Sequence, residues 1–83
     1  MDETAIRGPI RAYIVDNFLL GSAGELEDST QLMEAGILDS TGVIELVAFL
    51  ETTFGVTIAD EEIISKNLNS LNYISSFIAR KSS

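Results

Sequence analysis

Residues 40–54 carry the apolar pattern that most restricts how this chain can fold. At 100° per residue their apolar side chains fall on one face about 100° wide, which suits a helix that packs against a core. That face holds Val43, Leu46, Val47, Leu50 and Phe54. Gly55 follows directly, and glycine is the residue that most often ends a helix. The pattern predicts an amphipathic helix over residues 40–54 that must be covered by other helices.

Three further segments show helical spacing. In residues 9–20 one face holds Ile10, Tyr13, Ile14, Phe18 and Leu19. Proline suits the first turn of a helix, so this helix is predicted to begin near Gly8 or Pro9, after a loose or irregular turn. A short helix capped by Asp60 is expected to open with Glu61 and Glu62 and to be anchored by Ile63, Ile64 and Leu68. A last helix is predicted from Asn69 or Ser70, with Leu71, Ile74, Phe77 and Ile78 inward and the basic Arg80 and Lys81 at its end.

The connection over residues 21–39 is rich in Gly, Ser, Asp and Thr, which favours a long loop. Its apolar residues are expected to hold it to the core: Leu26, Leu32, Met33, Ile37 and Leu38. Residues 56–58 are too short for a persuasive strand. The predicted fold is therefore all-α, a small four-helix bundle with three longer helices, one short helix and a long first loop. At 83 residues the chain forms a single domain over 1–83, near the lower limit for an unaided core.

Charge and composition exclude several classes of function. Thirteen acidic residues against five basic ones give a net charge of −8, and the basic residues lie mostly at the two ends. Binding to nucleic acid or directly to an anionic membrane is therefore not expected. The chain has no histidine and no cysteine, so the usual general bases, metal ligands and thiol nucleophiles are missing. An independent enzyme is not expected, and neither is a metal site.

The same composition indicates a cytoplasmic protein. Without cysteine there is no disulfide to form, no apolar run approaches the roughly 20 residues of a membrane span, and the acidic N-terminus does not resemble a signal peptide. Met1 and the short tail after Lys81 favour a complete protein over the alternative of a domain cut from a larger one, and the protein is expected to be a monomer.

Ser40 stands directly after Asp39 at the head of the predicted helix over 40–54. Serine and aspartate are both preferred helix caps, so position alone favours a capping role for Ser40. The alternative is that Ser40 is a chemical attachment point. An exposed strip on the same helix, with Ile44 and Glu51 flanking Glu45, has the character of a small docking surface with a polar rim. An unmodified acidic interaction domain, in which Ser40 only caps the helix, is the competing interpretation.

The local pattern resembles that of a known family. Its residues are "GILDST" followed by "GVIELVAFLETTFGVTI", with Asp39-Ser40, then Glu45-Leu46, then Phe54 and Val56-Thr57-Ile58. This is similar to the phosphopantetheine-attachment segment of acyl and peptidyl carrier proteins, and the resemblance extends over nearly the whole chain. It implies that Ser40 carries a covalent 4′-phosphopantetheine arm taken from coenzyme A, and that acyl or aminoacyl cargo rides on the arm as a thioester. The cofactor then carries the chemistry, and the chain supplies placement and recognition.

The resemblance also implies a set of partners. These are a phosphopantetheinyl transferase, a ligase that loads acyl or aminoacyl groups, and downstream transferases or synthases, as in fatty acid or lipid biosynthesis. Recognition by them is assigned to Asp39, Ile44, Glu45 and Glu51. Fatty-acid-synthesis carriers usually show "GADSL", whereas here Ile37-Leu38 and Thr41 flank the Asp-Ser pair. The "GILDS" form looks more like stand-alone carriers for amino acids, D-alanine or special lipids, and it leaves the cargo open.

Overall fold

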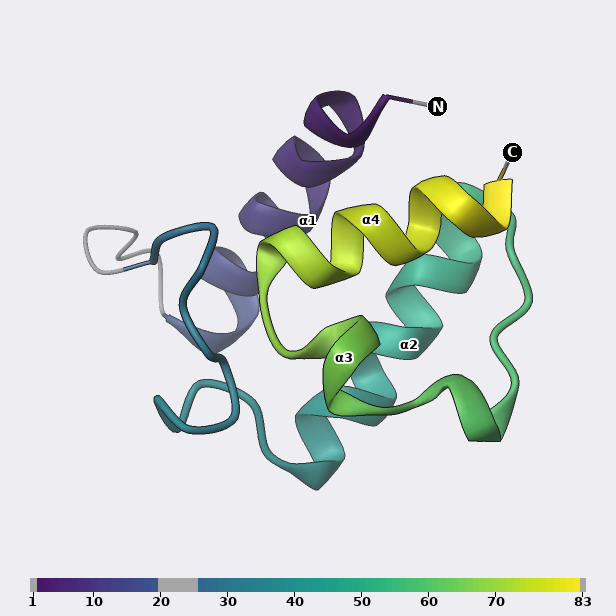
Figure 1. Cartoon of the computed structure of the whole chain (residues 1–83). Helices are drawn as coiled ribbons and strands as arrows, with labels where there is room; N and C mark the ends of the chain where they lie inside the picture. The colour runs from purple at the N-terminus through teal and green to yellow at the C-terminus, as the bar shows by residue number, and fades with distance from the viewer. Residues whose placement is uncertain (1, 20–25, 83) are drawn as a thin grey trace.

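The computed structural model describes residues 2–19 and 26–82, and within these ranges every regular element is helical (Figure 1). In chain order the elements are α1 (Glu3–Phe18), α2 (Ser40–Phe54), the 3₁₀ turn η1 (Asp60–Glu62), α3 (Ser65–Leu68) and α4 (Leu71–Ser82). In the described part no helix is long and apolar enough to cross a membrane. The prediction of an all-α helical bundle is confirmed.

Helix α1 begins earlier than predicted, at Glu3 instead of near Gly8 or Pro9. The Asp2 carboxylate caps it by accepting the Thr4 N–H at 3.3 Å, and the helix continues through Pro9. Proline's ring normally clashes with the Cβ of the preceding residue in a helix, but Gly8 has no Cβ. Burial of Ile6, with no exposed area, supplies a reason for the extra turns to form. The prediction that the helix begins near Pro9, which was based on the preference of proline for a first turn, is therefore wrong.

Helix α2 matches its predicted bounds because both of its ends are capped. At its start the Asp39 carboxylate accepts the Gly42 N–H at 2.7 Å. At its end Gly55 takes a left-handed conformation, with φ 66°, and donates its N–H to the Glu51 carbonyl at 3.0 Å. The predicted stripe is buried from Val43 to Leu50, and Phe54 is half-buried.

The segment from Leu26 to Asp39 is a loop held at several points. Arg11 forms an ion pair with Asp28 and donates to the Leu26 carbonyl at 2.6 Å, which ties the loop to α1. Leu26, Leu32 and Leu38 are buried and Met33 and Ile37 are half-buried, as predicted. Gly21 and Gly24, which belong to the predicted loop over residues 21–39, lie outside the described residues.

The chain after α2 differs from the single short helix that was predicted. It forms two separate turns, η1 and α3, joined by Ile63 and Ile64. Asp60 does not cap η1 but is its first residue, and the turn is closed instead by Glu62, whose carboxylate accepts the Ala59 N–H at 2.9 Å. Of the three expected anchors only Leu68 is buried, while Ile63 is half-buried and Ile64 is 48% exposed.

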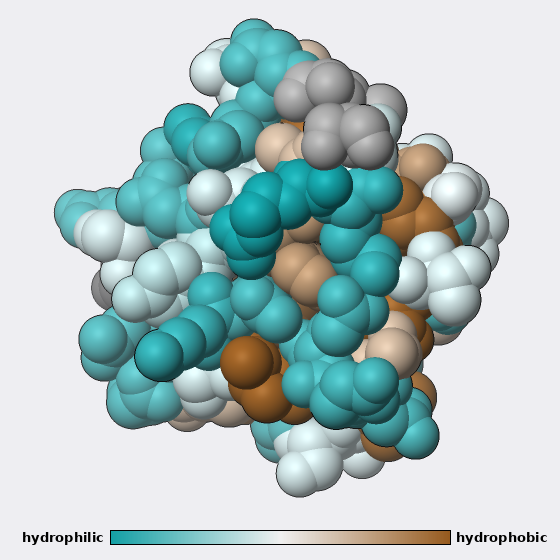
Figure 2. All heavy atoms as spheres, turned by 45° about the vertical axis from the view of Figure 1, so that its right-hand side comes forward, coloured by the Kyte–Doolittle hydropathy of each residue, from teal (hydrophilic) through white to brown (hydrophobic). Residues whose placement is uncertain are grey.

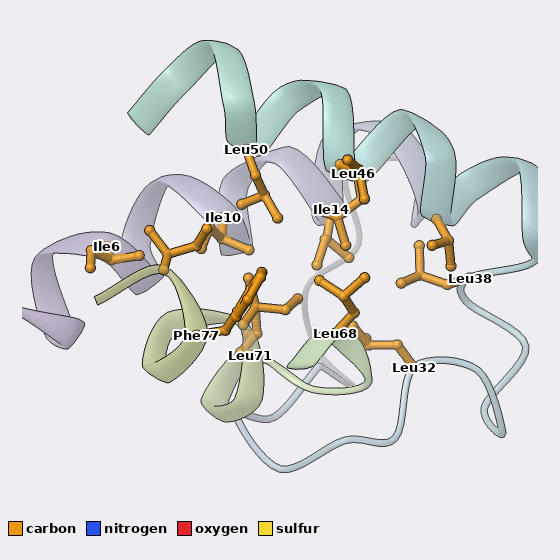
Figure 3. Packing of buried hydrophobic residues seen from close by; sticks show 14 of the residues in the cluster. Ile6, Ile10, Ile14, Leu32, Leu38, Leu46, Leu50, Leu68, Leu71 and Phe77 are labelled. Atoms are coloured by element: carbon orange, nitrogen blue, oxygen red, sulfur yellow. The ribbon is translucent and has the colours of Figure 1, made fainter. Parts of the chain in front are cut away.

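Helix α4 begins at Leu71, and the Ser70 hydroxyl caps it by accepting the Tyr73 N–H at 3.0 Å. It packs against α1, α2 and α3, so it is the element that joins the bundle (Figure 1). Its predicted inward residues are all buried. Figure 3 shows Leu71 and Phe77 of α4 meeting side chains of α1, α2 and the loop in one core. The residues labelled there are Ile6, Ile10, Ile14, Leu32, Leu38, Leu46, Leu50, Leu68, Leu71 and Phe77.

Candidate functional site

Ser40 is the first residue of α2, and its side chain is exposed. The helix cap is Asp39, whose carboxylate receives the Gly42 N–H. Within residues 2–19 and 26–82 no group forms a hydrogen bond with the Ser40 hydroxyl. The hypothesis that Ser40 serves only as a helix cap is therefore wrong, because the neighbouring aspartate performs that task.

The first turn of α2 also leaves backbone donors available beside this hydroxyl. The Val43 and Gly42 N–H groups are both taken up by Asp39, through its carbonyl and its carboxylate. The N–H groups of Ser40 and Thr41 have no acceptor among the described residues. Free N–H groups at the start of a helix of 15 residues favour a bound negative charge, and a phosphate diester on Ser40 would provide one.

An apolar groove of about 440 Å³ opens directly beside Ser40. Its walls come from the loop before α2, from α2 itself and from the segment after η1. They are formed by Met33, Leu38, Asp39, Ser40, Val43, Ile44 and Ile63. A second groove of about 310 Å³ shares Ile44 and Ile63 with the first and continues along α2 toward Glu51 and Ile58. An arm attached to Ser40 therefore starts next to an apolar surface.

The four residues predicted to be read by partners fall into two groups. Ile44, which is 67% exposed, and Glu45 lie free on the outer face of α2. Asp39 and Glu51 also have structural tasks, since the Glu51 carboxylate accepts the Ile58 N–H at 2.9 Å. Ile44 and Glu51 both line the second groove. Of these four residues, Ile44 best matches the exposed docking residue that the sequence predicted.

The face of the molecule seen in Figure 2 is mostly hydrophilic. On the face seen in Figure 2, hydrophobic residues reach the surface as separate brown areas bordered by hydrophilic ones. The second groove has Glu51 and Asp60 on its rim. In the described part of the chain no cluster of acidic residues is arranged to hold a metal ion.

On the other flank of α2, Glu45 lies near a row of aromatic rings. Tyr13 of α1 stacks on Phe49 of α2 at 4.1 Å between ring centroids, and Phe18 and Phe54 extend the row at either end. Burial raises the pKa of the Tyr13 hydroxyl, and the negative charge of Glu45 raises it further. Glu45 therefore lies on the side of α2 that is near Tyr13 of α1.

Sequence reasoning missed three residues that shape the site. Ile63 was expected in the core, yet it forms the wall shared by both grooves. Gly42 allows close packing at the start of α2, because a Cβ there would lie 3.0 Å from the Phe18 ring and 3.2 Å from the Asp39 carboxylate. Asn69, expected only as a helix start, is buried and bonded to the loop before Ser40. No periodicity or motif marks any of these contacts, since all three depend on how distant segments pack.

Comparison with protein families gives one match over most of the chain. Residues 10–78 match the family described as the phosphopantetheine attachment site, PP-binding. The matched range contains Ser40, both grooves and the whole of α2.

Two curated relatives are carrier proteins, and one solved structure contains a chain of similar fold. The chain is 33% identical over 61 residues to D-alanyl carrier proteins of Streptococcus suis (strain 05ZYH33) and Streptococcus mutans serotype c, over 74% of this chain and 76% of each relative. A chain in a structure titled "Crystal structure of FAD-dependent dehydrogenase" is 30% identical, with a TM-score of 0.75 over 83% of this chain and 97% of that one. This chain belongs to the phosphopantetheine-binding family, and it is not a catalyst but a carrier of acyl or aminoacyl groups on a covalently attached 4′-phosphopantetheine.

Proposed function

We propose that Ser40 is the residue that bears the 4′-phosphopantetheine arm. The observation that supports this most is the division of tasks at the start of α2. Asp39 caps the helix, and this leaves the adjacent Ser40 hydroxyl exposed and without a hydrogen-bond partner in residues 2–19 and 26–82. Ser40 thus presents an accessible hydroxyl at a helix start, beside an apolar groove. A transferase needs such an accessible hydroxyl.

Loading needs no catalytic group from the carrier. The Ser40 oxygen forms a bond to the phosphorus that carries pantetheine, and the bond from that phosphorus to the adenosine-bearing phosphate of coenzyme A breaks. The hydroxyl proton leaves to a base of the transferase. The chain contributes placement: the start of α2 fixes the hydroxyl, and the free N–H groups of Ser40 and Thr41 favour the phosphodiester charge.

The arm supplies a terminal thiol, on which cargo is held as a thioester. Along its path the apolar groove offers contact to the arm through Met33, Val43 and Ile44. The exposed Ile44 and Glu45 offer a weak docking surface to partner enzymes. Weak docking suits a carrier, because a carrier must leave each enzyme in turn.

The proposed cargo is a small aminoacyl group. The relatives named D-alanyl carrier protein support this choice. The acidic rim at Glu51 and Asp60 also supports it, since carboxylates attract the ammonium group of an aminoacyl thioester. The partners then include a ligase that activates the amino acid, beside the phosphopantetheinyl transferase.

The proposal includes a monomeric and cytoplasmic carrier, in which residues 1–83 form one domain. A net charge of −8 disfavours self-association. A chain without cysteine needs no oxidising compartment.

Intact mass measurement tests the attachment site. The purified chain is incubated with coenzyme A, Mg²⁺ and a broad-specificity phosphopantetheinyl transferase, next to Ser40→Ala. We expect the wild type to gain one phosphopantetheine and the variant to gain none while it stays helical by circular dichroism. An unchanged wild-type mass with several transferases, or full loading of Ser40→Ala, would refute the proposal.

Cargo is tested by trapping the thioester from cells that make the protein and weighing it. An aminoacyl adduct is expected. A fatty acyl adduct on the same arm would keep the carrier function but reject the cargo assignment, and it would favour a role in fatty acid or lipid biosynthesis.

A further inference from the structure

Asn69, between α3 and α4, is a buried polar residue with 6% of its surface exposed. Its side-chain oxygen accepts the Met33 N–H at 2.9 Å, and its side-chain nitrogen donates to the Glu34 carboxylate at 2.8 Å. Its backbone carbonyl accepts the Leu32 N–H at 2.8 Å. One buried residue therefore binds three consecutive residues of the loop that precedes Ser40.

These three residues begin the turn that leads to Ser40. The Leu32 carbonyl accepts the N–H groups of Ile37 at 2.9 Å and Leu38 at 3.1 Å, which folds the loop back on itself. Gly36 makes this possible, because its φ of 76° lies in the left-handed region. The next residue after Leu38 is the cap Asp39, followed by Ser40. Hydrogen bonds thus link Asn69 to Leu32 and Leu32 to Leu38, which is bonded covalently to the cap of α2.

The same contacts set one wall of the groove beside Ser40. Met33, whose backbone is held by the Asn69 side chain, lines this groove together with Ser40 and Ile63. Release of the Met33 N–H would leave a donor without its partner and allow the turn to move away from α4. Both the position of the hydroxyl and the shape of the groove therefore depend on Asn69.

We propose that Asn69 is a positioning residue for the loading of Ser40: through its bonds to Met33 and Glu34 it holds the loop in the conformation that the phosphopantetheinyl transferase accepts. This inference rests on the proposed role of Ser40. If a variant lets the loop sample other conformations, only a fraction of the carrier molecules can bind the enzyme. The apparent affinity then equals the intrinsic affinity multiplied by that fraction. The KM for the carrier rises and kcat stays the same.

Exchange of the two polar partners gives a sharp test. In Asn69→Asp the carboxylate still accepts the Met33 N–H, but it faces the Glu34 carboxylate and loses the donor. Adding Glu34→Gln restores a donor, since the Gln amide nitrogen can bond the new Asp. We expect Asn69→Asp to raise KM for the carrier by about tenfold, as it would if about one carrier in ten kept the competent loop. The double variant is expected to recover most of this loss.

Two controls and one milder test variant accompany the exchange. Glu34→Gln alone keeps an oxygen that accepts from Asn69, so KM should stay at the wild-type value. Ile6→Val removes a buried methyl group of α1 and lowers stability without contacting the loop, so KM should again be unchanged. Glu34→Ala removes only the outer bond from an exposed side chain and should raise KM by about threefold, near the lower end of a hydrogen bond's net worth.

The outcomes separate this inference from the proposed function. If the wild type gains no arm, the role of Ser40 fails and this inference with it. If the wild type is loaded but folded Asn69→Asp has the wild-type KM, or the double variant is no better than Asn69→Asp, the positioning role alone is overturned. Should Asn69→Asp fail to fold, a wild-type KM for Glu34→Ala overturns it.

Discussion

At the start of α2 the Asp39 carboxylate accepts the Gly42 N–H at 2.7 Å, whereas the adjacent Ser40 hydroxyl has no partner among the described residues. From the sequence both residues were reasonable caps, because both are preferred at that position. The choice between them depends on backbone geometry: Asp39 has extended φ and ψ, and Ser40 is already helical. A cap residue must be the extended one, and no local sequence pattern fixes which of two adjacent candidates that is.

This division of tasks predicts that the two residues contribute unequally to stability. Asp39→Ala removes the cap and should lower the free energy of unfolding by about 1 kcal/mol. Ser40→Ala removes an exposed hydroxyl without a partner and should change it by less than about 0.5 kcal/mol. Urea denaturation followed by circular dichroism measures both. A larger loss in Ser40→Ala than in Asp39→Ala would mean that the serine caps the helix after all.

Among the elements, the bounds of α2 and the start of α4 could be predicted almost to the residue. Each helix has a strong apolar stripe and a capping residue directly before its first turn. The start of α1 and the segment between α2 and α4 could not. For α1, tertiary burial of Ile6 outweighed the usual position of proline. For the segment after α2, the apolar residues Ile63 and Ile64 were expected in the core but lie at a groove wall and at the surface. Short turns have too few residues to show a period, so their inward face is set by packing.

The course of α1 through Pro9 gives a prediction at the same scale. In a continuous helix Pro9 leaves the Ala5 carbonyl without its N–H donor, and proline in a helix interior costs roughly 3 kcal/mol relative to alanine. Pro9→Ala should therefore stabilise the protein, by about 1–3 kcal/mol. Thermal and urea unfolding test this. Destabilisation by Pro9→Ala would indicate that α1 starts at Pro9, as the sequence first indicated.

Glu62 joins η1 to the end of α4 and gives the fold a specific pH dependence. Its carboxylate accepts from Lys81 Nζ at 2.7 Å and from the Ala59 N–H at 2.9 Å. The hydrogen bond from Lys81 is the main cause that lowers the pKa of Glu62 below its ordinary value of 4.5, followed by that from Ala59. A lowered pKa in the folded state stabilises the fold above the unfolded value, and this contribution is lost as pH falls through the folded value.

Lys81→Met should therefore lower the melting temperature most at pH 6–7, in a range about two units above the unfolded pKa. The difference in melting temperature between wild type and Lys81→Met should become smaller as pH falls below 4.5. Lys66→Met removes an exposed positive charge on α3 and serves as the matched control, with no such narrowing. A gap that is constant from pH 7 to pH 3 would contradict a role for the Glu62–Lys81 bond.

For the whole molecule, the sequence indicated the fold class, the acidic character and the family, because these depend on periodicity, charge and a motif that spans much of the chain. The grooves beside Ser40 and the bonds of Asn69 could not be predicted. Both bring together loop residues near 33 and residues near 63 and 69, and a single sequence carries no record of which distant segments touch.

A net charge of −8 would attract any partner enzyme that presents a basic surface. Glu45 is exposed beside Ile44, and we propose that such a surface contacts it. Glu45→Lys should lower kcat/KM for loading, and the loss should shrink as salt rises from about 0.01 M to 0.15 M and the Debye length falls from about 30 Å to 8 Å. Glu27→Lys makes the same charge change at an exposed position in the loop after α1 and is the control. Equal effects of the two variants would mean that only net charge matters.

The most direct test of the account is to locate the arm. The chain contains nine serines, and fragment-ion mass spectrometry of the loaded protein shows which of them carries 4′-phosphopantetheine. The account predicts that the added mass lies on Ser40 alone. An arm on any other serine, or none in a protein that transferases fail to load, would contradict it.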